Sequence, residues 1–322
     1  MSFKILALIA GLLVCIVPVA AMPTPLTING DLSDWGITDQ DLQNGLNNND
    51  ESAWVPTGAS SNVIWVVEND VYANPLHPGY PDEYPNGYDY GVHIKSIRGA
   101  GNQLGGYSPY VEPTVNGYVQ PCGGEIWDIE ALYIDEDSNY VYVAIVTSIP
   151  PDGYSGCSAT SPSHCPGDLA IDIDLNPATG GYGYDYGVRL GSYDNNQFKI
   201  YRTDDDNDWY VTQVLPGNKP ATVDVANATY VGDAIGAYVY KGTWETRPSG
   251  GNTSVYVIEL AIPKTAIGED GRSLFGHAFR MHVAEAGCGN DAANNEIPEF
   301  PLILVPIGII IGFLYYYNMR RT

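Results

Sequence analysis

Positively charged residues are scarce in this chain. Its 322 residues include 14 lysines and arginines against 38 aspartates and glutamates, which gives a formal net charge of −24. Nucleic-acid binding needs a cationic surface that neutralises phosphates, and this composition does not supply one. Anionic membrane surfaces are poor partners for the same reason. The excess of carboxylates suits either a secreted protein in contact with divalent cations or moderate adaptation to salt.

Sequence motifs of the common enzyme classes are also missing. The chain has no Gly-x-Ser-x-Gly, no His-Glu-x-x-His and no P-loop. His277 and His282 are five residues apart in an expected strand, which places them on opposite faces and argues against a shared metal. We therefore predict that the protein is not an enzyme. A glycoside hydrolase needs only two carboxylates, so a secreted glycoside-active enzyme stays open as an alternative.

No convincing amphipathic helix is found between residues 26 and 296. The 25 tyrosines favour strands, while 36 glycines and 23 prolines mark turns between them. Strand-like segments span residues 63–68, 88–97, 126–134, 140–147, 168–175, 184–190, 198–202, 209–215, 234–240, 254–262 and 278–284. Residues 140–147 (YVYVAIVT) are apolar on both faces and predict a central strand. The pattern predicts an all-β fold, a large antiparallel β-sandwich over residues 22–290.

Only five cysteines are present. Cys15 lies in an N-terminal apolar run, which leaves an even number, as expected for disulfides in an exported chain. Cys157 and Cys165 flank a short loop and are expected to pair, which leaves Cys122 with Cys288. Zinc is the competing use of four cysteines, but no Cys-x-x-Cys spacing is present.

The N-terminus has the pattern of a secretory signal peptide. Lys4 precedes an apolar stretch from residue 5 to 19, and small residues, Ala20 and Ala21, precede Met22. We predict cleavage after residue 21, so that the mature chain is exported.

The C-terminus has the pattern of a membrane tail. Residues 291–299 are expected to be a polar linker, residues 300–318 a transmembrane helix and residues 319–322 a basic cytoplasmic end. The 18 residues from 300 to 317 would form a helix of roughly 27 Å, just enough to cross a bilayer core.

The order of these tail segments resembles the PEF-CTERM sorting signal of archaeal surface proteins. Pro298, Glu299 and Phe300 stand as the signature tripeptide. The resemblance implies an archaeosortase-type enzyme that cuts near the tripeptide and transfers the protein to another anchor. The alternative is a single-span anchor that is never cut. Both interpretations place the protein on the cell surface.

The segment from Thr27 to Trp35 (TINGDLSDW) resembles the opening of family 9 carbohydrate-binding modules and related DOMON-like sandwiches. Further blocks at residues 123–133, 167–172 and 288–291 are similar to those of exported proteins with such C-terminal signals. The resemblance implies a sandwich fold, jelly-roll or DOMON-like, and a surface role without assigning an activity. Asp31 and Asp34 in the first block are alternatively turn-capping residues.

Acidic residues recur at alternate positions in three places, around residues 135–139, 172–176 and 204–208. Carboxylates two residues apart in a turn can converge on Ca²⁺, which takes six to eight oxygens. The predicted ligands are Asp168, Asp172, Asp174, Asp204, Asp206 and Asp208. The alternative is charge at hairpin tips and on one polar strand face. Glu130 and Glu259 lie within apolar strands and are predicted to be buried, partnered carboxylates.

Aromatic rings can stack on sugars while their polar edges stay hydrated. Trp54, Trp127, Trp209 and Trp244 and the tyrosine-rich loop at residues 80–90 are therefore candidate sugar-binding groups, although tryptophan in a sandwich is often a core residue. Asn227 and Asn252 begin N-glycosylation sequons.

Two functional classes agree with these features. The first is a non-catalytic cell-surface module that binds a glycan or another envelope polymer, with Ca²⁺ holding its loops. The second is a structural subunit of an extracellular sheath, S-layer-like coat or filament, in which copies of the chain contact one another. The sequence does not separate the two.

Overall fold

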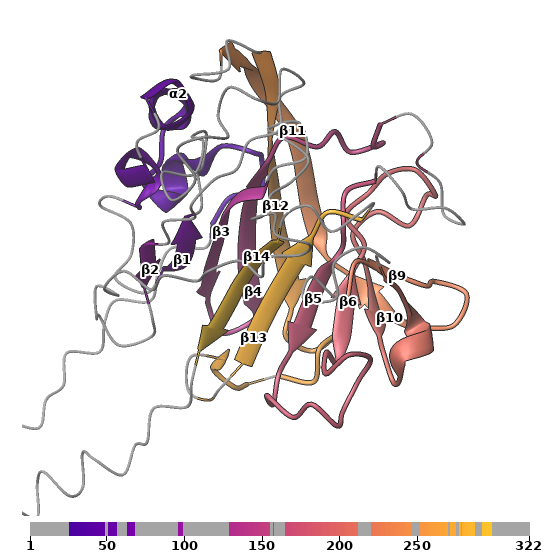
Figure 1. The fold of residues 1–322 in the computed structure, drawn as a ribbon. Helices are drawn as coiled ribbons and strands as arrows, with labels where there is room; N and C mark the ends of the chain where they lie inside the picture. The colour runs from indigo at the N-terminus through magenta and orange to yellow at the C-terminus, as the bar shows by residue number, and fades with distance from the viewer. Residues whose placement is uncertain are drawn as a thin grey trace, which may run out of the picture.

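The computed structural model describes residues 26–48, 51–56, 63–67, 96–98, 129–154, 157, 165–211, 220–245, 252–269, 271–274, 277, 279–286 and 292–297. Strands dominate these ranges and form two six-stranded antiparallel sheets that pack against each other (Figure 1). The predicted all-β class and the antiparallel pairing are therefore confirmed.

Sheet 1 has the spatial order β11 (Ile235–Glu245), β12 (Asn252–Pro263), β4 (Tyr140–Thr147), β3 (Ile129–Glu136), β1 (Ile64–Val67) and β2 (Ser96–Arg98). β4 is an inner strand, as predicted. Val143 on β4 packs between the sheets, whereas Ala144 packs on the opposite face against the N-terminal segment. Because successive side chains of a strand point to opposite faces, an all-apolar strand needs cover on both sides.

Sheet 2 has the spatial order β10 (Thr229–Asp233), β7 (Lys199–Arg202), β6 (Tyr186–Val188), β5 (Leu169–Asp172), β13 (Phe279–Ala284) and β14 (Ala292–Ile297). Its inner face supplies residues such as Ile171 and Met281 to the same buried cluster as Leu260 of sheet 1. This shared core holds the two sheets together as a sandwich.

A short helical layer covers the outer face of sheet 1. It contains η1 (Leu32–Trp35), α2 (Asp39–Asn48) and η2 (Glu51–Trp54). The prediction of no helix in this part of the chain is therefore wrong. Thr38 and Asp41 cap the start of α2 reciprocally, each side chain bonding the other's backbone N–H. Burial of Leu42 then stabilises a helix that is otherwise rich in weak helix formers.

A small hairpin covers the outer face of sheet 2. It pairs β8 (Trp209–Tyr210) with β9 (Thr222–Val223) and follows η4 (Asp206–Asp208). Trp209 and Val223 pack there against Tyr184 and Tyr201. The predicted strand at residues 209–215 is thus described only as the two residues of β8, since residues 212–219 lie outside the described ranges.

The prediction of a polar linker at residues 291–299 is wrong for residues 292–297, which form β14. The six residues of β14 pair with the whole of β13, from Ala292 opposite Ala284 to Ile297 opposite Phe279. An edge strand pairs on one side only, so it forms without the apolar pattern that marks an inner strand. The folded domain therefore extends to Ile297, and Pro298 follows, which has no N–H to continue a ladder.

Several predicted features lie outside the described residues. They are the signal peptide (1–21), the tripeptide Pro298, Glu299 and Phe300, the membrane segment (300–318), the basic end (319–322), and Trp127, Cys122 and Cys288. Within the described part of the chain, no helix is both long and apolar enough to span a bilayer. The predicted Cys157–Cys165 disulfide is present.

Candidate metal centre

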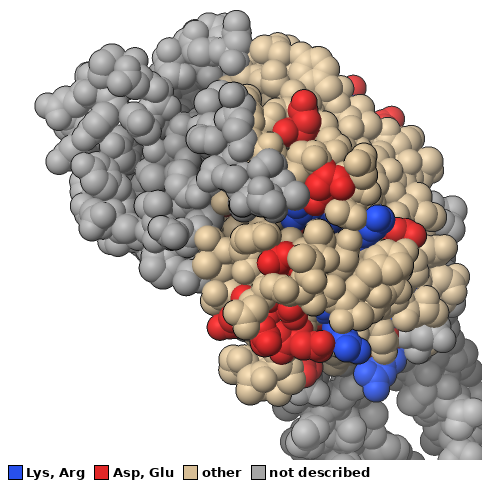
Figure 2. Space-filling model, turned by 90° about the vertical axis from the view of Figure 1, so that its right-hand side faces the viewer, with Lys and Arg blue, Asp and Glu red and all other residues tan. Residues whose placement is uncertain are grey.

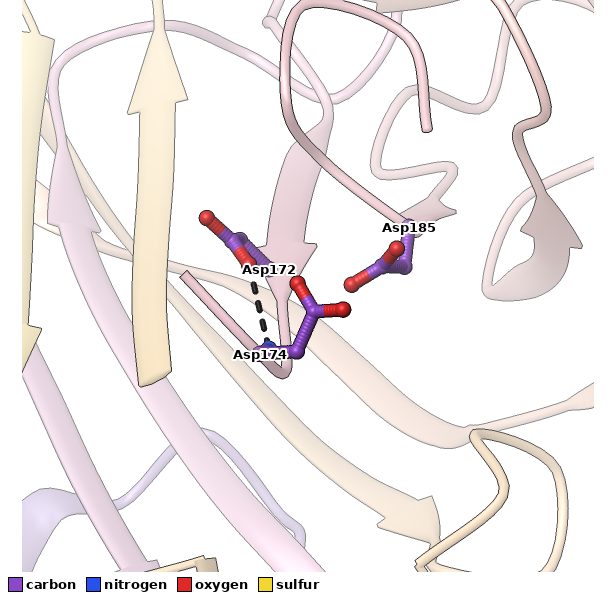
Figure 3. A group of neighbouring side chains, drawn as sticks. All are labelled: Asp172, Asp174 and Asp185. Carbon is purple, nitrogen blue, oxygen red and sulfur yellow. Dashed lines mark hydrogen bonds between the residues drawn. The ribbon is translucent and has the colours of Figure 1, made fainter. Parts of the chain in front are cut away.

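Three carboxylates meet where β5 ends and β6 begins. Asp172 is the last residue of β5, Asp174 lies in the turn that follows, and Asp185 directly precedes β6. One carboxylate oxygen from each lies within 4.8 Å of the other two. Figure 3 shows the carboxylate of Asp174 between those of Asp172 and Asp185.

The backbone of the turn is shaped by these side chains. Asp172 Oδ1 accepts hydrogen bonds from the backbone N–H groups of Asp174 (3.2 Å) and Leu175 (2.7 Å). Asp185 Oδ2 accepts one from Ile173 N–H (3.0 Å), which ties the two ends of the loop together. Leu175 has a positive φ of 51°, an uncommon conformation for a residue with a side chain. The sequence thus bends the chain so that three acids converge.

The cluster carries more negative charge than its neighbours balance. Arg280 contacts Asp172 at 2.9 Å, and it is the one ion pair with a cluster member among the described residues. Burial raises the pKa of Asp185, and the charges of Asp174 and Asp172 raise it further. Burial also raises the pKa of Asp172. On the face of the molecule drawn in Figure 2, acidic side chains gather toward the lower end.

A pocket of about 420 Å³ adjoins the cluster. Its polar lining comes from Asp174, Thr179, Asp185, Tyr186, Arg202, Thr203 and Asp204. Hard divalent cations prefer oxygen ligands, and Ca²⁺ takes six to eight of them, more than the one oxygen that each of the three carboxylates brings to the cluster. The pocket leaves room for water or another oxygen donor to complete the coordination. The donor set therefore fits a divalent cation.

The structure brings together only two of the six predicted ligands, Asp172 and Asp174. Asp168 is instead fully buried in an ion pair with Arg189, at 3.0 Å. It also accepts hydrogen bonds from the backbone N–H groups of Leu190 and Val223. Asp168 is not part of the three-acid cluster, and these partners make it a structural carboxylate between β5, β6 and β9.

The three predicted ligands in the loop at residues 204–208 do not converge on one position. Asp204 pairs with Arg202 at 3.1 Å, and Asp206 accepts a hydrogen bond from the backbone N–H of Tyr182. Asp208 accepts hydrogen bonds from the backbone N–H groups of Asp204 and Asp205, so it caps its own turn. Of these residues, Asp204 alone lines the pocket.

Sequence reasoning missed Asp185, the third member of the cluster. It stands in the segment YDYGV at residues 184–188, which also occurs at residues 88–92. An acid just before a strand that pairs with β5 was the available signal, because antiparallel neighbours bring the end of one strand beside the start of the next.

Two of the candidate sugar-binding tryptophans, Trp54 and Trp209, have little free ring surface. Trp54 is completely buried, with its indole N–H donating to the carbonyl oxygens of Asp41 and Leu42. Trp209 is 5% exposed beneath the β8–β9 hairpin. Both are therefore core residues, and their prediction as sugar-binding groups is wrong. Trp244 is partly buried in the cluster on the outer face of sheet 1.

Glu259 is buried and partnered, as predicted. One carboxylate oxygen accepts hydrogen bonds from the backbone N–H groups of Asn29 and Gly30, and the other accepts one from the indole N–H of Trp35 at 2.8 Å. We call this set the Glu259 clamp. Asp31 caps η1 through the backbone N–H of Ser33, in agreement with the turn-capping alternative.

Glu130 is also fully buried, in β3. Of the two sequon residues, Asn227 is exposed in a turn before β10, and Asn252 begins β12.

Comparison with protein-family models gave no match to this chain. A search of curated proteins likewise gave no match.

Proposed function

We propose that this protein is a non-catalytic cell-surface module whose β-sandwich binds an envelope glycan or a related polymer. In this proposal, Ca²⁺ at Asp172, Asp174 and Asp185 holds the loop between β5 and β6. The sandwich would be of the DOMON-like or family 9 carbohydrate-binding type, exported by the N-terminal signal. The C-terminal PEF-type signal, read by an archaeosortase-type enzyme, would then anchor it.

The convergence of three carboxylates from both ends of one loop carries this proposal. A cation there would offset the repulsion that raises the pKa of Asp185 and would join β5 to β6. Three carboxylates with a pocket beside them offer oxygen ligands, which suit Ca²⁺ better than they suit softer metals. The Cys157–Cys165 disulfide supports an exported protein, because disulfides persist in oxidising compartments.

The cation part of the proposal is tested by calcium titration of the full chain. Ca²⁺ should raise the melting temperature, because a ligand that binds only the folded state stabilises it by mass action. Titration calorimetry should show one site that is lost in Asp185→Asn. The matched control is Asp233→Asn, which changes an exposed acid on β10, outside the cluster.

Calcium binding that persists in Asp185→Asn would contradict the assigned site. A melting temperature that is the same with Ca²⁺ and with EDTA would contradict cation binding altogether.

One observation favours the alternative of a structural subunit. β11 is a strand of 11 residues at the edge of sheet 1, and Ile235 at its start is 56% exposed. A long strand edge can pair with another chain. Purified protein that forms regular assemblies, with no glycan binding, would support this alternative.

A further inference from the structure

Tyrosines gather at one end of the sandwich, on the side of β11 and β12 that faces sheet 2. Tyr240 lies opposite Tyr256 in the strand register, with ring centroids 5.5 Å apart. Tyr238 meets Tyr256 edge to face at 6.0 Å. Tyr154 comes from the loop that follows β4. We call these four residues the tyrosine face.

Backbone contacts hold the inner rings in place. The hydroxyl of Tyr238 donates to the carbonyl oxygen of Ile149 at 2.6 Å, and that of Tyr154 donates to Ser148 at 3.2 Å. Tyr240 is different, since 54% of it is exposed although it packs against Tyr256. A rigid aromatic surface is thus left open to solvent.

Hydroxyl groups border this surface. Tyr240 shares a hydrogen bond with the hydroxyl of Thr243 at 2.6 Å, and Thr243 shares another with Ser254 at 3.1 Å. These groups can both donate and accept hydrogen bonds. An aromatic ring with hydroxyls at its rim matches a sugar, which has an apolar C–H face and polar edges.

The charge that the described residues place near the tyrosine face disfavours an anionic occupant. Burial raises the pKa of Tyr238 and of Tyr256, and the negative charge of the exposed Asp152 carboxylate raises both further. Burial also raises the pKa of Tyr154 to about 12, so that this phenol is a neutral donor at physiological pH. Lys241, the cation on this stretch of β11, turns to the opposite side and contacts Asp39 and the carbonyl oxygen of Gly30. Among the residues that the structure describes, a carboxylate without a neighbouring cation thus borders the tyrosine face, and it suits the hydroxyls of a neutral sugar.

The position of the tyrosine face also suits an external ligand. Thr147, at the end of β4, pairs with Tyr256, and the loops at this end are joined by a bond from Ser192 N–H to the carbonyl oxygen of Pro151. β14 ends at the other end of the sandwich, where Ile297 pairs with Phe279 (Figure 1). The 25 residues that follow Ile297 in the sequence therefore start at the end away from the tyrosine face.

We propose that the tyrosine face binds a neutral glycan chain, with a sugar ring stacked on Tyr240 and sugar hydroxyls bonded to Asp152, Thr243 and Ser254. This inference rests on the proposed glycan-binding function and names the ligand class and the surface.

Titration calorimetry of the full chain in a detergent without a sugar headgroup tests the inference. The probes are neutral hexasaccharides of glucose, mannose and N-acetylglucosamine, with hexagalacturonate as the anionic probe. At least one neutral probe should bind, and hexagalacturonate should not. Tyr240→Ala should weaken the binding about tenfold or more, which corresponds to about 1.4 kcal/mol. Tyr240→Phe, which keeps the ring, should weaken it far less.

Tyr230→Ala is the matched control, since Tyr230 is 51% exposed on β10 but outside the tyrosine face. It should leave the binding unchanged. The inference is overturned if no neutral probe binds, if only hexagalacturonate binds, or if Tyr230→Ala and Tyr240→Ala have equal effects. It is also overturned if Tyr240→Ala instead abolishes self-association in sedimentation measurements, because the face would then be a contact between copies.

The two proposals fail in different ways. Glycan binding that needs Tyr240 but is unaffected by EDTA would keep the tyrosine face and remove the cation from the function. Glycan binding that is lost in Asp185→Asn and retained in Tyr240→Ala would keep the proposed function and overturn the tyrosine face.

Discussion

Glu259 shows at the scale of a single residue how a buried charge is kept in this fold. Burial raises the pKa of its carboxyl, while the hydrogen bonds from Asn29, Trp35 and Gly30 lower it. Since the carboxyl lies on β12, on the outer face of sheet 1, and its donors lie in the N-terminal segment, the residue joins two parts of the chain. Its role is structural, and it is the kind of residue whose loss is costly.

Replacing Glu259 by glutamine should destabilise the protein by about 1–3 kcal/mol, the range for leaving a buried donor or acceptor without a partner. The glutamine N–H₂ cannot accept the bonds that a carboxylate oxygen accepts, so at least one donor of the clamp loses its partner. Urea unfolding measures the change in the free energy of unfolding. Asp233→Asn, which alters an exposed acid, should change it by less than about 0.5 kcal/mol.

The difference in stability between the natural protein and Glu259→Gln should depend on pH. A carboxyl whose pKa is raised in the folded state, here above the ordinary 4.5, binds its proton more tightly when folded than when unfolded. Its contribution to stability therefore increases as the pH falls through the folded pKa and is complete below 4.5. The stability advantage of the natural protein over Glu259→Gln should grow on acidification. An advantage that shrinks from pH 7 to pH 4.5 would contradict the raised pKa.

At the scale of elements, the inner strands could be predicted, whereas the edge strands β10 and β14 and the outer helix α2 could not. β4 and β12 show apolar residues on alternate or on both faces, because an inner strand is packed on both sides. β14 and α2 lack such a pattern, since pairing to β13 and the packing of Trp54 stabilise them instead. For a similar reason, only two of the three acids in the cluster at the end of β5 were predicted. Asp172 and Asp174 are close in the sequence, whereas Asp185 joins them only through strand pairing.

The role of β14 can be tested with two truncations. A chain that ends at Ile297 keeps the strand, and its β-sandwich should melt at the temperature of the full chain. A chain that ends at Asp291 lacks six paired residues and should melt roughly 5 °C lower or more, because several hydrogen bonds of about 0.5–1.5 kcal/mol each are lost. Circular dichroism melts of both chains give the comparison. Equal melting temperatures would show that β14 contributes nothing to the stability of sheet 2.

At the scale of the whole molecule, excess negative charge is the dominant electrostatic feature. The formal charge is −24, and Figure 2 shows few cations among the acids on the face drawn there. Net charge far from zero keeps a protein soluble but destabilises the compact state through self-repulsion. The ion pairs of Arg189 with Asp168 and of Lys264 with Glu136 are both buried, so they leave this surface repulsion in place.

Sodium chloride should therefore stabilise the protein. Raising the ionic strength from about 0.01 to about 0.15 M shortens the Debye length from about 30 to about 8 Å, which screens repulsion between surface carboxylates. The melting temperature should rise over this range in the presence of EDTA, which removes any effect of bound cations. A melting temperature that falls with salt would mean that attractive ion pairs outweigh the repulsion.

The Glu259 clamp also has a consequence for the proposed export, because it sets the order in which the chain could fold as it is exported. Its two sides, Asn29 and Glu259, are 230 positions apart in the sequence, so they meet only when nearly the whole domain has crossed the membrane. β12 also lies between β11 and β4, and β4 leaves the export channel more than a hundred residues earlier. Such long-range pairing makes folding slow, because a large loop must close before the contacts form. The chain would thus stay unfolded throughout its passage, which is the state that a narrow export channel requires.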